Sequence, residues 1–172
     1  MIKQGTPEWH KERLGLFTSS HLSDLMVKGK NSEFGDTAMS YIYKVAAERT
    51  LADEFISGAG FEMYLERMDM TSKSIRWGKD FEDMAREKLS ELLWLTVNEA
   101  EFIKVTDYFG GSSDGWLEND GLIVPIEIKC PTPGVFKQYS KIESSEQLYK
   151  VSKAYYYQCF GHMMEYNANS CL

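Results

Sequence analysis

The sequence lacks the features of a secreted, membrane-spanning or zinc-binding protein. It contains three cysteines and no C-x-x-C pair, which argues against a disulfide scaffold, a zinc site and an iron–sulfur cluster. It has no run of about 18 apolar residues that could cross a membrane, and residues 1–5 lack the hydrophobic segment of a signal peptide. No internal repeat is visible. These absences predict an intracellular, cytoplasmic protein without a membrane partner.

Basic residues are outnumbered, and their distribution is more informative than their total. The net charge is −7, with 19 Lys and Arg against 26 Asp and Glu. Residues 1–30 hold five basic and three acidic side chains, residues 129–153 hold five and two, and residues 31–128 hold nine and twenty. Because phosphate contacts are local, basic segments can bind nucleic acid beside an acidic metal site. Charge alone leaves open the alternative of an ordinary acidic protein.

The length of 172 residues fits one domain, and a hydrophobic content of 43% is enough for a packed core. Apolar periodicity and turn residues predict helices over residues 7–13, 21–26, 37–55, 61–70, 74–93 and 150–165. Runs of β-branched and aromatic residues predict strands over residues 94–97, 101–106, 109–117 and 122–130. The order predicts an α+β domain, with helices on both sides of a central, mainly antiparallel sheet.

Two of these helices have predicted faces that bear on function. In 74–93 the expected core stripe lies next to a second stripe that contains Gly78, Glu82 and Arg86. In 150–165 the buried side is expected at Tyr156, Phe160 and Met163 or Met164, which leaves Gln158 and His162 on another side. His162 has no second His or Cys at zinc spacing, so a metal-ligand role is not expected for it. The core stripe predicted for 74–93 comprises Trp77, Phe81, Met84, Ala85, Lys88 and Leu92.

The most informative feature is a pair of short motifs on either side of a turn. Asn119-Asp120-Gly121 is typical of a tight β-hairpin turn, and a hairpin centred near Asp120 places Asp114 opposite Ile126 or Glu127. Glu127 and Lys129 are two residues apart and share a face of an extended strand. Two carboxylates and an ammonium group therefore converge. Adjacent carboxylates repel unless a cation lies between them, and Mg²⁺ is the natural ion for an all-oxygen site.

A surface hairpin with acids and lysines for solubility is the alternative, because an E-x-K pattern alone is common. Glu127 and Lys129, however, interrupt the run 122–130, which otherwise reads as a buried strand. Buried charges need a partner or a metal to offset their desolvation. The motif therefore favours a functional site in which a metal activates water. Glu82 is a plausible third acid there, although most helix glutamates are solvated surface residues.

A second candidate site lies near the N-terminus. Thr18, Ser19 and Ser20 precede a predicted helix, and free N–H groups and hydroxyls at such a position can bind a phosphate, with Arg13 close by in the sequence. The alternative is that the hydroxyls only cap the helix.

These motifs together resemble the lambda-type (YqaJ-like) phage recombination exonucleases of the PD-(D/E)XK nuclease superfamily. The resemblance covers nearly the whole chain, and five blocks occur in the family's order. They are Arg13-Leu14-Gly15-Leu16-Phe17-Thr18-Ser19-Ser20 (R-L-G-x-[IV]-T-A-S), Trp77-Gly78-Lys79-Asp80-Phe81-Glu82 (W-G-x-x-[FY]-E), Ser112-Ser113-Asp114-Gly115 (S-P-D-G), Glu127-Ile128-Lys129-Cys130-Pro131 (E-[IL]-K-C-P) and Tyr155-Tyr156-Tyr157-Gln158 (Y-x-x-Q).

The resemblance implies a restriction-endonuclease-like core and a Mg²⁺-dependent exonuclease, with Mn²⁺ expected to substitute. Such an enzyme digests the 5′-ended strand of linear duplex DNA and leaves 3′ tails for a single-strand annealing protein. Relatives commonly form ring-shaped homotrimers, and a phage or prophage protein in a bacterial host is implied.

The resemblance also implies a role for each matching residue. Asp114, Glu127 and the Ile128 carbonyl would hold the metal, Lys129 would orient or deprotonate the attacking water, and Glu82 would support a second metal or the water. Gln158 would help to position this cluster. The 5′ phosphate would be bound by Arg13, Ser20 and Ser112.

The chain departs from the family pattern at two motif positions and at its end. Ser113 replaces the usual proline and Ser19 the usual alanine, and neither change affects the acids. The family normally continues beyond residues 169–172 through another strand and a helical part, so residues 1–172 are expected to form a single nuclease domain without these elements. A site-specific endonuclease of the same superfamily and a non-catalytic DNA-binding module are the alternatives. The intact Asp114, Glu127 and Lys129 argue against the second.

Overall fold

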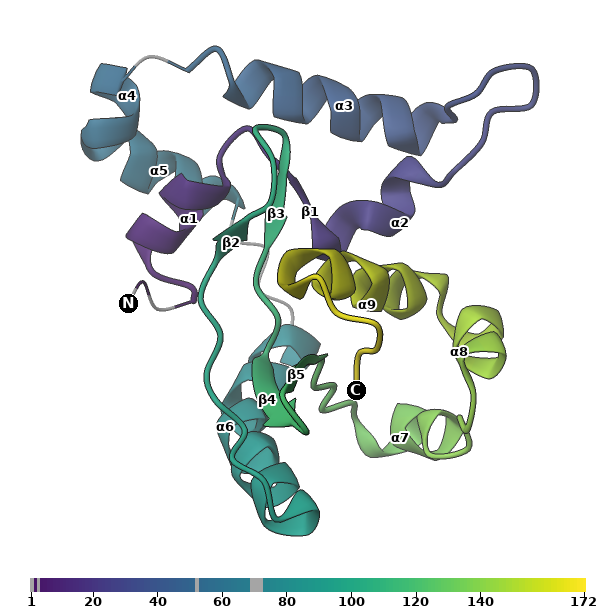
Figure 1. The fold of residues 1–172 in the computed structure, drawn as a ribbon. Helices are drawn as coiled ribbons and strands as arrows, with labels where there is room; N and C mark the ends of the chain where they lie inside the picture. Colours follow the sequence, from purple (N-terminus) through teal and green to yellow (C-terminus); the bar gives the residue numbers. More distant parts are fainter. Residues whose placement is uncertain (1, 3, 52, 69–72) are drawn as a thin grey trace.

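The computed structural model describes residues 2, 4–51, 53–68 and 73–172, without the side chains of residues 53–54, 67–68 and 73–75 (Figure 1). The helices are α1 (Pro7–Arg13), the short 3₁₀ helix η1 (Ser19–His21), α2 (Leu22–Leu25), α3 (Asp36–Glu48), α4 (Asp53–Ser57), α5 (Ala59–Met68), α6 (Lys73–Leu93), α7 (Pro133–Tyr139), α8 (Ser145–Val151) and α9 (Lys153–Tyr166). The strands are β1 (Phe17–Thr18), β2 (Ile103–Lys104), β3 (Phe109–Gly111), β4 (Gly115–Asn119) and β5 (Leu122–Ile126).

The predicted helices are present, with corrected boundaries. The expected helix over 37–55 ends at Glu48, and the chain resumes helical structure in α4. The expected helix over 150–165 starts at Lys153, because Ser152 is extended and its hydroxyl accepts a hydrogen bond from the N–H of Tyr155 as an N-cap. The predicted end of the helix over 61–70 falls at residues 69–70, outside the described residues. None of the helices that the structure describes is long and apolar enough to cross a membrane.

The strands confirm a mixed α+β protein but form two small sheets. One sheet has the order β1-β3-β2, with β1 parallel and β2 antiparallel to β3, and the other is the antiparallel pair β4-β5. The expected strand over 109–117 is interrupted at residues 112–114, and residues 94–97 contribute only a bridge next to them, between Asn98 and Trp116. A single central sheet is therefore not seen among the described residues. The strand β1 was not predicted.

The β4-β5 hairpin has the predicted turn. Asn119 pairs with Leu122, and the two loop residues Asp120 and Gly121 have φ angles of 52° and 77°. Positive φ at both positions is the conformation of a type I′ turn, which Asp-Gly adopts readily. The inner side of the hairpin packs into a core of Val97, Leu117 and Ile126, with Leu89 of α6 and Ile128 against it. This packing fixes which face of the hairpin is buried.

The buried side of α9 is polar, which corrects the predicted stripe. Gly161, His162 and Glu165 are buried, whereas Phe160 and Met164 are exposed. In Figure 1, α9 crosses the centre of the molecule, where it packs against η1, α2, β3 and β5. A helix can approach η1 this closely only at a residue without a side chain, because a Cβ at Gly161 would lie 2.9 Å from the Ser19 Cα. The close approach of α9 to η1 at Gly161 therefore decides which face of α9 is buried.

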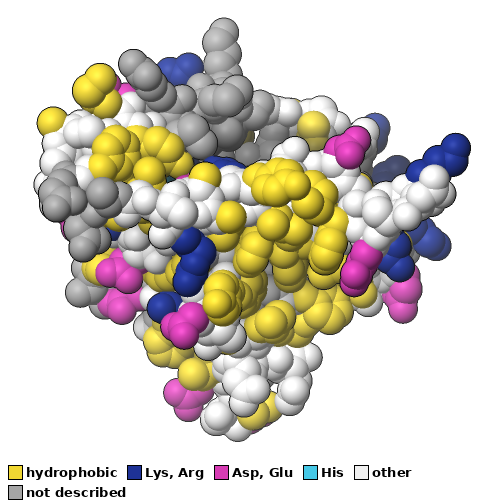
Figure 2. Space-filling model, turned by 90° about the horizontal axis from the view of Figure 1, so that it is seen from above, with side chains coloured by type: hydrophobic (Ala, Val, Ile, Leu, Met, Phe, Trp, Pro, Cys, Tyr) yellow, Lys and Arg dark blue, Asp and Glu magenta, His cyan; other side chains and the backbone are white. Residues whose placement is uncertain are grey.

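The inner face of α6 also differs from the prediction. Trp77, Met84 and Leu92 are exposed, whereas Glu82 and Arg86, which were placed on the adjacent stripe, are half-buried. Part of the apolar surface thus lies outside the core. Large hydrophobic side chains of the loop after α2 and of α3, such as Phe34 and Tyr43, are also exposed. These two segments lie at the top of Figure 1. Figure 2, viewed from above, shows hydrophobic side chains gathered at that end.

The close contact at Gly161 predicts a specific loss of stability. Gly161→Ala should lower the free energy of unfolding by about 1–3 kcal/mol, because the added methyl group overpacks the contact with Ser19. Gly78→Ala in α6 is the matched control, because no other described group lies within 4 Å of the position of its Cβ. That change should be neutral or stabilise the helix by up to about 1 kcal/mol. Urea denaturation of both variants would measure the difference, and equal stabilities would contradict the α9-η1 contact.

Candidate active site

Asp114 and Glu127 lie opposite one another where the hairpin leaves its core. Gly115 pairs with Ile126, and the N–H of Asp114 donates to the Ile126 carbonyl at 3.0 Å, which confirms the predicted register. The N–H of Ile128 donates to Oδ2 of Asp114 at 2.7 Å. The strand β5 ends at Ile126 and not at residue 130 as predicted, so the backbone N–H of Ile128 is available to the carboxylate. Asp114 is only 8% exposed.

Glu127 is held on both of its carboxylate oxygens. Its side chain is 4% exposed, Oε1 contacts Nζ of Lys129, and Oε2 accepts a hydrogen bond from Nε2 of His162 at 2.7 Å. Its backbone N–H donates to the carbonyl of Leu172, and the N–H of Leu172 donates to the carbonyl of Pro125. Asp114, Glu127 and Lys129, termed here the hairpin-end cluster, therefore converge as the sequence predicted.

The pKa values in the hairpin-end cluster are driven apart. Burial, reinforced by the charge of Glu127, raises the pKa of Asp114 to about 7. Burial acts in the same direction on Glu127, but hydrogen bonds and charge from His162 and Lys129 outweigh it and lower the pKa of Glu127. Burial opposes the charge of Lys129, yet the two carboxylates raise the pKa of Lys129. Near neutral pH Glu127 is thus ionised, whereas Asp114 is close to the midpoint of its titration.

Glu82 of α6 lies beside the hairpin-end cluster. A cavity of about 520 Å³, termed the acidic cavity, is lined by Glu82, Asp114 and Lys129 together with Lys79 and the backbone around Ile128. Glu82 is half-buried, and burial raises its pKa despite an ion pair with Arg86 at 3.3 Å. Arg86 also donates from Nε to the carbonyl of Asp114 at 3.0 Å. The third acid suggested by the sequence is therefore brought to the cluster.

Gln158 is near the cluster but does not touch its acids. It is half-buried on α9, one turn before His162 and three residues after Tyr155. The Nζ of Lys129 lies 4.9 Å from the centre of the Tyr155 ring, which places this side of α9 at the acidic cavity. Within the described part of the chain, no hydrogen bond joins Gln158 to Asp114 or Glu127.

His162 is a member of the site that the sequence analysis set aside. Its side chain is 1% exposed, with Nε2 on Glu127 and Nδ1 3.0 Å from Oε2 of Glu165. Oε1 of Glu165 in turn accepts from the hydroxyl of Ser19. The spacing of His162 and Glu165, three residues apart beside Gly161, was the available signal, but it was masked by the apolar residues on the other side of the helix.

The residues predicted to bind a phosphate gather around Arg13, and no hydroxyl of Thr18, Ser19 or Ser20 caps the described helices η1 and α2. Nη2 of Arg13 donates to Oγ of Ser20 at 3.3 Å and to Oγ1 of Thr18 at 3.5 Å, and the guanidinium stacks 3.9 Å from the Trp9 ring. Nε1 of Trp9 donates to Oγ of Ser112 at 3.2 Å. Trp9 therefore links the three predicted residues.

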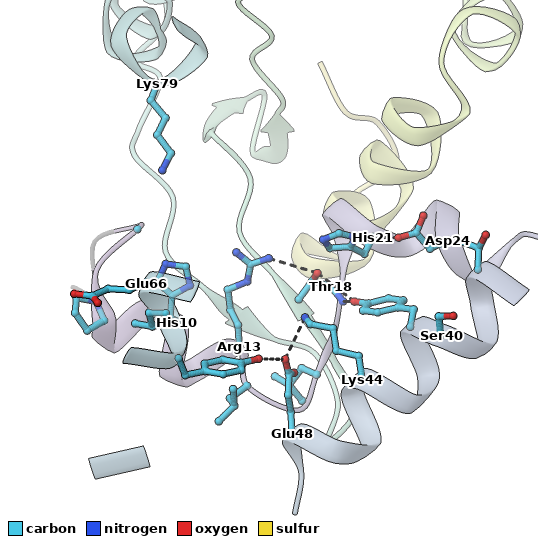
Figure 3. Close-up of a pocket in the computed structure, with 18 residues that line it drawn as sticks. His10, Arg13, Thr18, His21, Asp24, Ser40, Lys44, Glu48, Glu66 and Lys79 are labelled. Carbon is cyan, nitrogen blue, oxygen red and sulfur yellow. Dashed lines mark hydrogen bonds and ion pairs between the residues drawn. The ribbon is translucent and has the colours of Figure 1, made fainter. Parts of the chain in front are cut away.

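A second cavity, of about 970 Å³, lies beside Arg13 and is termed the Arg13 cavity. Figure 3 shows Arg13 reaching towards Thr18, with Lys44 of α3 on one side and Lys79 extending from α6 on the other. Burial lowers the pKa of Arg13 to about 10, so the guanidinium stays protonated at neutral pH. Lys79 lines both cavities. The larger cavity thus carries the cationic side chains Arg13, Lys44 and Lys79 together with Asp24, Glu48 and Glu66, and it adjoins the acidic cavity at Lys79.

The donor set fits a hard divalent cation. Among the described residues, no group of three or more His, Cys, Asp or Glu side chains is arranged to hold a metal ion. The hairpin-end cluster instead offers two carboxylates and the Ile128 backbone, and Mg²⁺ usually binds through one or two carboxylates plus water and substrate oxygens. Burial raises the pKa of Asp114, and the charge of the adjacent Glu127 carboxylate adds to the shift, which a bound cation would oppose.

The comparisons with known proteins concern the family and the fold. The family described as the YqaJ-like viral recombinase domain matches residues 8–166. Two crystal structures of an alkaline exonuclease (LHK-Exo) from Laribacter hongkongensis have a similar fold, with TM-scores of 0.69 and, for its complex with dAMP, 0.70. Each is 21% identical in sequence, and the alignment covers 96% of this chain and 71% of that chain. No curated protein matches the sequence.

The raised pKa of Asp114 predicts a pH-dependent stability of the metal-free protein. The folded protein keeps the proton to about pH 7, whereas the ordinary value is 3.8, so the unfolded chain releases the proton first. The free energy of unfolding should therefore fall as the pH rises from about 4 to 7. Asp114→Asn should flatten that slope, and Asp120→Asn in the exposed turn should leave it unchanged. Chemical denaturation in EDTA would measure both, and identical slopes in the Asp114→Asn variant and the parent would disprove the assignment.

Proposed function

The chain belongs to the YqaJ-like viral recombinase family, and we propose that it is a Mg²⁺-dependent exonuclease that digests the 5′-ended strand of linear duplex DNA. The observation that carries this proposal is the convergence of Asp114, Glu127 and Lys129 at the end of one hairpin, beside the Arg13 cavity. The proposal treats residues 1–172 as a single nuclease domain of the PD-(D/E)XK type, in which an acid pair and a lysine act on a phosphodiester.

Asp114, Glu127 and the carbonyl of Ile128 would hold the metal ion. When bound, Mg²⁺ would supply the positive charge that this site lacks, acidify a water and neutralise the scissile phosphate. Glu82 would support a second ion or the attacking water from α6. Mn²⁺, which accepts the same oxygen donors, is expected to substitute.

Lys129 would orient the attacking water. Its ammonium contacts Glu127, and the ring of Tyr155 limits it on the other side. The raised pKa of Lys129 favours a charged, orienting role over a role as the base that removes the proton. Gln158 would help to keep this wall of the acidic cavity in position from α9.

The 5′ phosphate would be held by Arg13, Ser20 and Ser112. A guanidinium fork and two hydroxyls match the oxygens of a terminal phosphate, and charge-assisted bonds are the stronger kind. Ser112 is two residues before Asp114, a stretch of backbone that spans at most about 7 Å. A phosphate bound there lies within one or two nucleotides of the acids, which is the arrangement that an end-directed nuclease needs.

The product would be a duplex with a 3′ tail, and the active assembly would be a homotrimer. Digestion from the 5′ end leaves a 3′ single-stranded tail, the substrate of a single-strand annealing protein. A ring-shaped homotrimer would pass DNA along the basic segments at residues 1–30 and 129–153. A covalently closed circular duplex should resist digestion under conditions that degrade its linear form, whereas a site-specific endonuclease would cut both.

Removal of a cluster side chain should abolish digestion but spare DNA binding. Glu127→Ala, or Glu127→Gln as a milder change, should lower the rate about 10³-fold or more, since a metal ion contributes several kcal/mol to the transition state. Lys129→Ala should lower it by about 10²–10⁴-fold. Glu118→Ala, an exposed acid on the same hairpin, is the control. The assay is release of end-labelled nucleotides with and without Mg²⁺, alongside a binding assay in EDTA. Digestion at the parental rate would refute the assignment.

Arg13 should determine the preference for a phosphorylated end. Arg13→Ala should reduce the advantage of 5′-phosphorylated over 5′-hydroxyl duplex by about 10–100-fold, because a hydrogen bond to a charged group contributes about 1.5–3 kcal/mol. Lys11→Ala removes a charge from the same helix without touching the Arg13 cavity and should keep the preference. Initial rates on the two substrates measure it. An Arg13→Ala variant with the parental ratio would exclude this role.

A further inference from the structure

A line of polar side chains runs from η1 through α9 to the hairpin-end cluster. The hydroxyl of Ser19 donates to Oε1 of Glu165, Oε2 of Glu165 lies 3.0 Å from Nδ1 of His162, and Nε2 of His162 lies 2.7 Å from Oε2 of Glu127. The side chains of Glu165 and His162 are 0% and 1% exposed. Glu127 is the only member of this line that also contacts Lys129 among the described residues.

Burying three charged groups in this way is costly, and the fold makes room for them. Transfer of an unpaired charge to the interior is strongly unfavourable, so each group must be paired and hydrogen-bonded. Gly111 of β3 faces the Glu165 carboxylate and Gly161 faces Ser19, and a side chain at either position would displace this line. A helix that needed only to pack could have done so with apolar residues at lower cost.

We propose that His162 and Glu165 are positioning residues that fix the orientation of the Glu127 carboxylate, so that its Oε1 edge is presented to the metal and to Lys129. This inference rests on the proposed nuclease function and adds to it a support that none of the five motifs contains. Glu165 holds the imidazole ring by Nδ1, and the ring in turn holds Oε2 of Glu127.

The geometry requires His162 to donate from both ring nitrogens, because each faces a carboxylate oxygen. Although burial opposes the charge, the hydrogen bonds to Glu127 and Glu165 raise the pKa of His162 to about 10, which agrees with two donated protons. The imidazolium also balances one of the buried carboxylates. Glu127 can therefore stay ionised without a metal, and its rotamer is set before an ion arrives. Carboxylate–histidine supports of this kind orient metal ligands in other proteins.

The test compares two amide replacements that differ in which ring nitrogen they imitate. In His162→Gln the amide nitrogen can reach the place of Nε2 and donate to Glu127, whereas in His162→Asn it reaches only the place of Nδ1. His162→Asn should weaken Mn²⁺ binding about 10–100-fold, and His162→Gln should retain most of the affinity. Titration calorimetry of the full chain with Mn²⁺ and no DNA measures this directly.

Digestion assays give a second measurement. The Mg²⁺ concentration for half-maximal rate should rise in His162→Asn, and part of the lost rate should return at saturating Mg²⁺. Val97→Ala in the hairpin core is the control for stability, because it removes core packing without touching the line. It should lower the unfolding midpoint and leave Mn²⁺ affinity unchanged. Should His162→Asn not fold, Glu165→Gln tests the same support from its other end and should also weaken Mn²⁺ binding.

The outcomes separate this inference from the proposed function. Parental Mn²⁺ affinity in folded His162→Asn or Glu165→Gln would overturn the positioning role. A loss of Mn²⁺ affinity that follows the loss of stability in the same way in His162→Asn, His162→Gln and Val97→Ala would also overturn the positioning role. Such a result would show that His162 only stabilises the fold. Failure of the proposed function has a different signature, namely no Mg²⁺-dependent digestion by the parent, or digestion that survives Glu127→Gln.

Discussion

The register of the β4-β5 hairpin is the constraint on which the site depends. Two hydrogen bonds set the two acids opposite one another: the N–H of Asp114 donates to the Ile126 carbonyl, and the N–H of Ile128 donates to the Asp114 carboxylate. A slip of one residue would exchange the two faces of the strand and turn Ile126 towards the surface. The Asp-Gly turn and the core of Val97, Leu117 and Ile126 specify the same register independently, so the acids are placed by features that have no part in chemistry.

Asp114 and Glu127 bring two carboxylates close together, and the neighbouring cations balance their negative charge only in part. Lys129 and His162 contact Glu127, and Arg86 is directed to Glu82 and to the Asp114 carbonyl. Among the described residues no cation forms an ion pair with the Asp114 carboxylate, on which Lys129 acts only through its charge. Burial, reinforced by the charge of Glu127, therefore raises the pKa of Asp114 to about 7 despite the charge of Lys129. A bound divalent cation would balance the negative charge of Asp114 and that of a phosphate at the same time. A phosphate-binding site beside the hairpin-end cluster is therefore consistent with cation binding there.

The sequence was informative where local rules decide the structure and uninformative where distant contacts do. The turn, the approach of Asp114 to Glu127 and the helix at Pro7 follow from turn chemistry and periodicity. The two-residue strand β1 depends on a parallel partner about 90 residues away, for which no local pattern exists. The buried face of α9 was mispredicted because apolar counting favours Phe160 and Met164, whereas the close approach at Gly161 and the pairing of His162 with Glu165 and Glu127 decide it.

The positions of the two cavities favour the proposed digestion from a DNA end over cleavage within a duplex. Lys79 lines both cavities, and Ser112, which Trp9 holds, is two residues from Asp114. In the proposed function, a phosphate bound at Arg13 would therefore lie a short distance from the acids. Internal phosphates carry one negative charge and two ester bonds, whereas a terminal phosphate carries up to two charges and three free oxygens. A guanidinium with two hydroxyls discriminates between these by charge and by hydrogen-bond count, so binding of the end itself would align the next phosphodiester with Glu127 and Lys129.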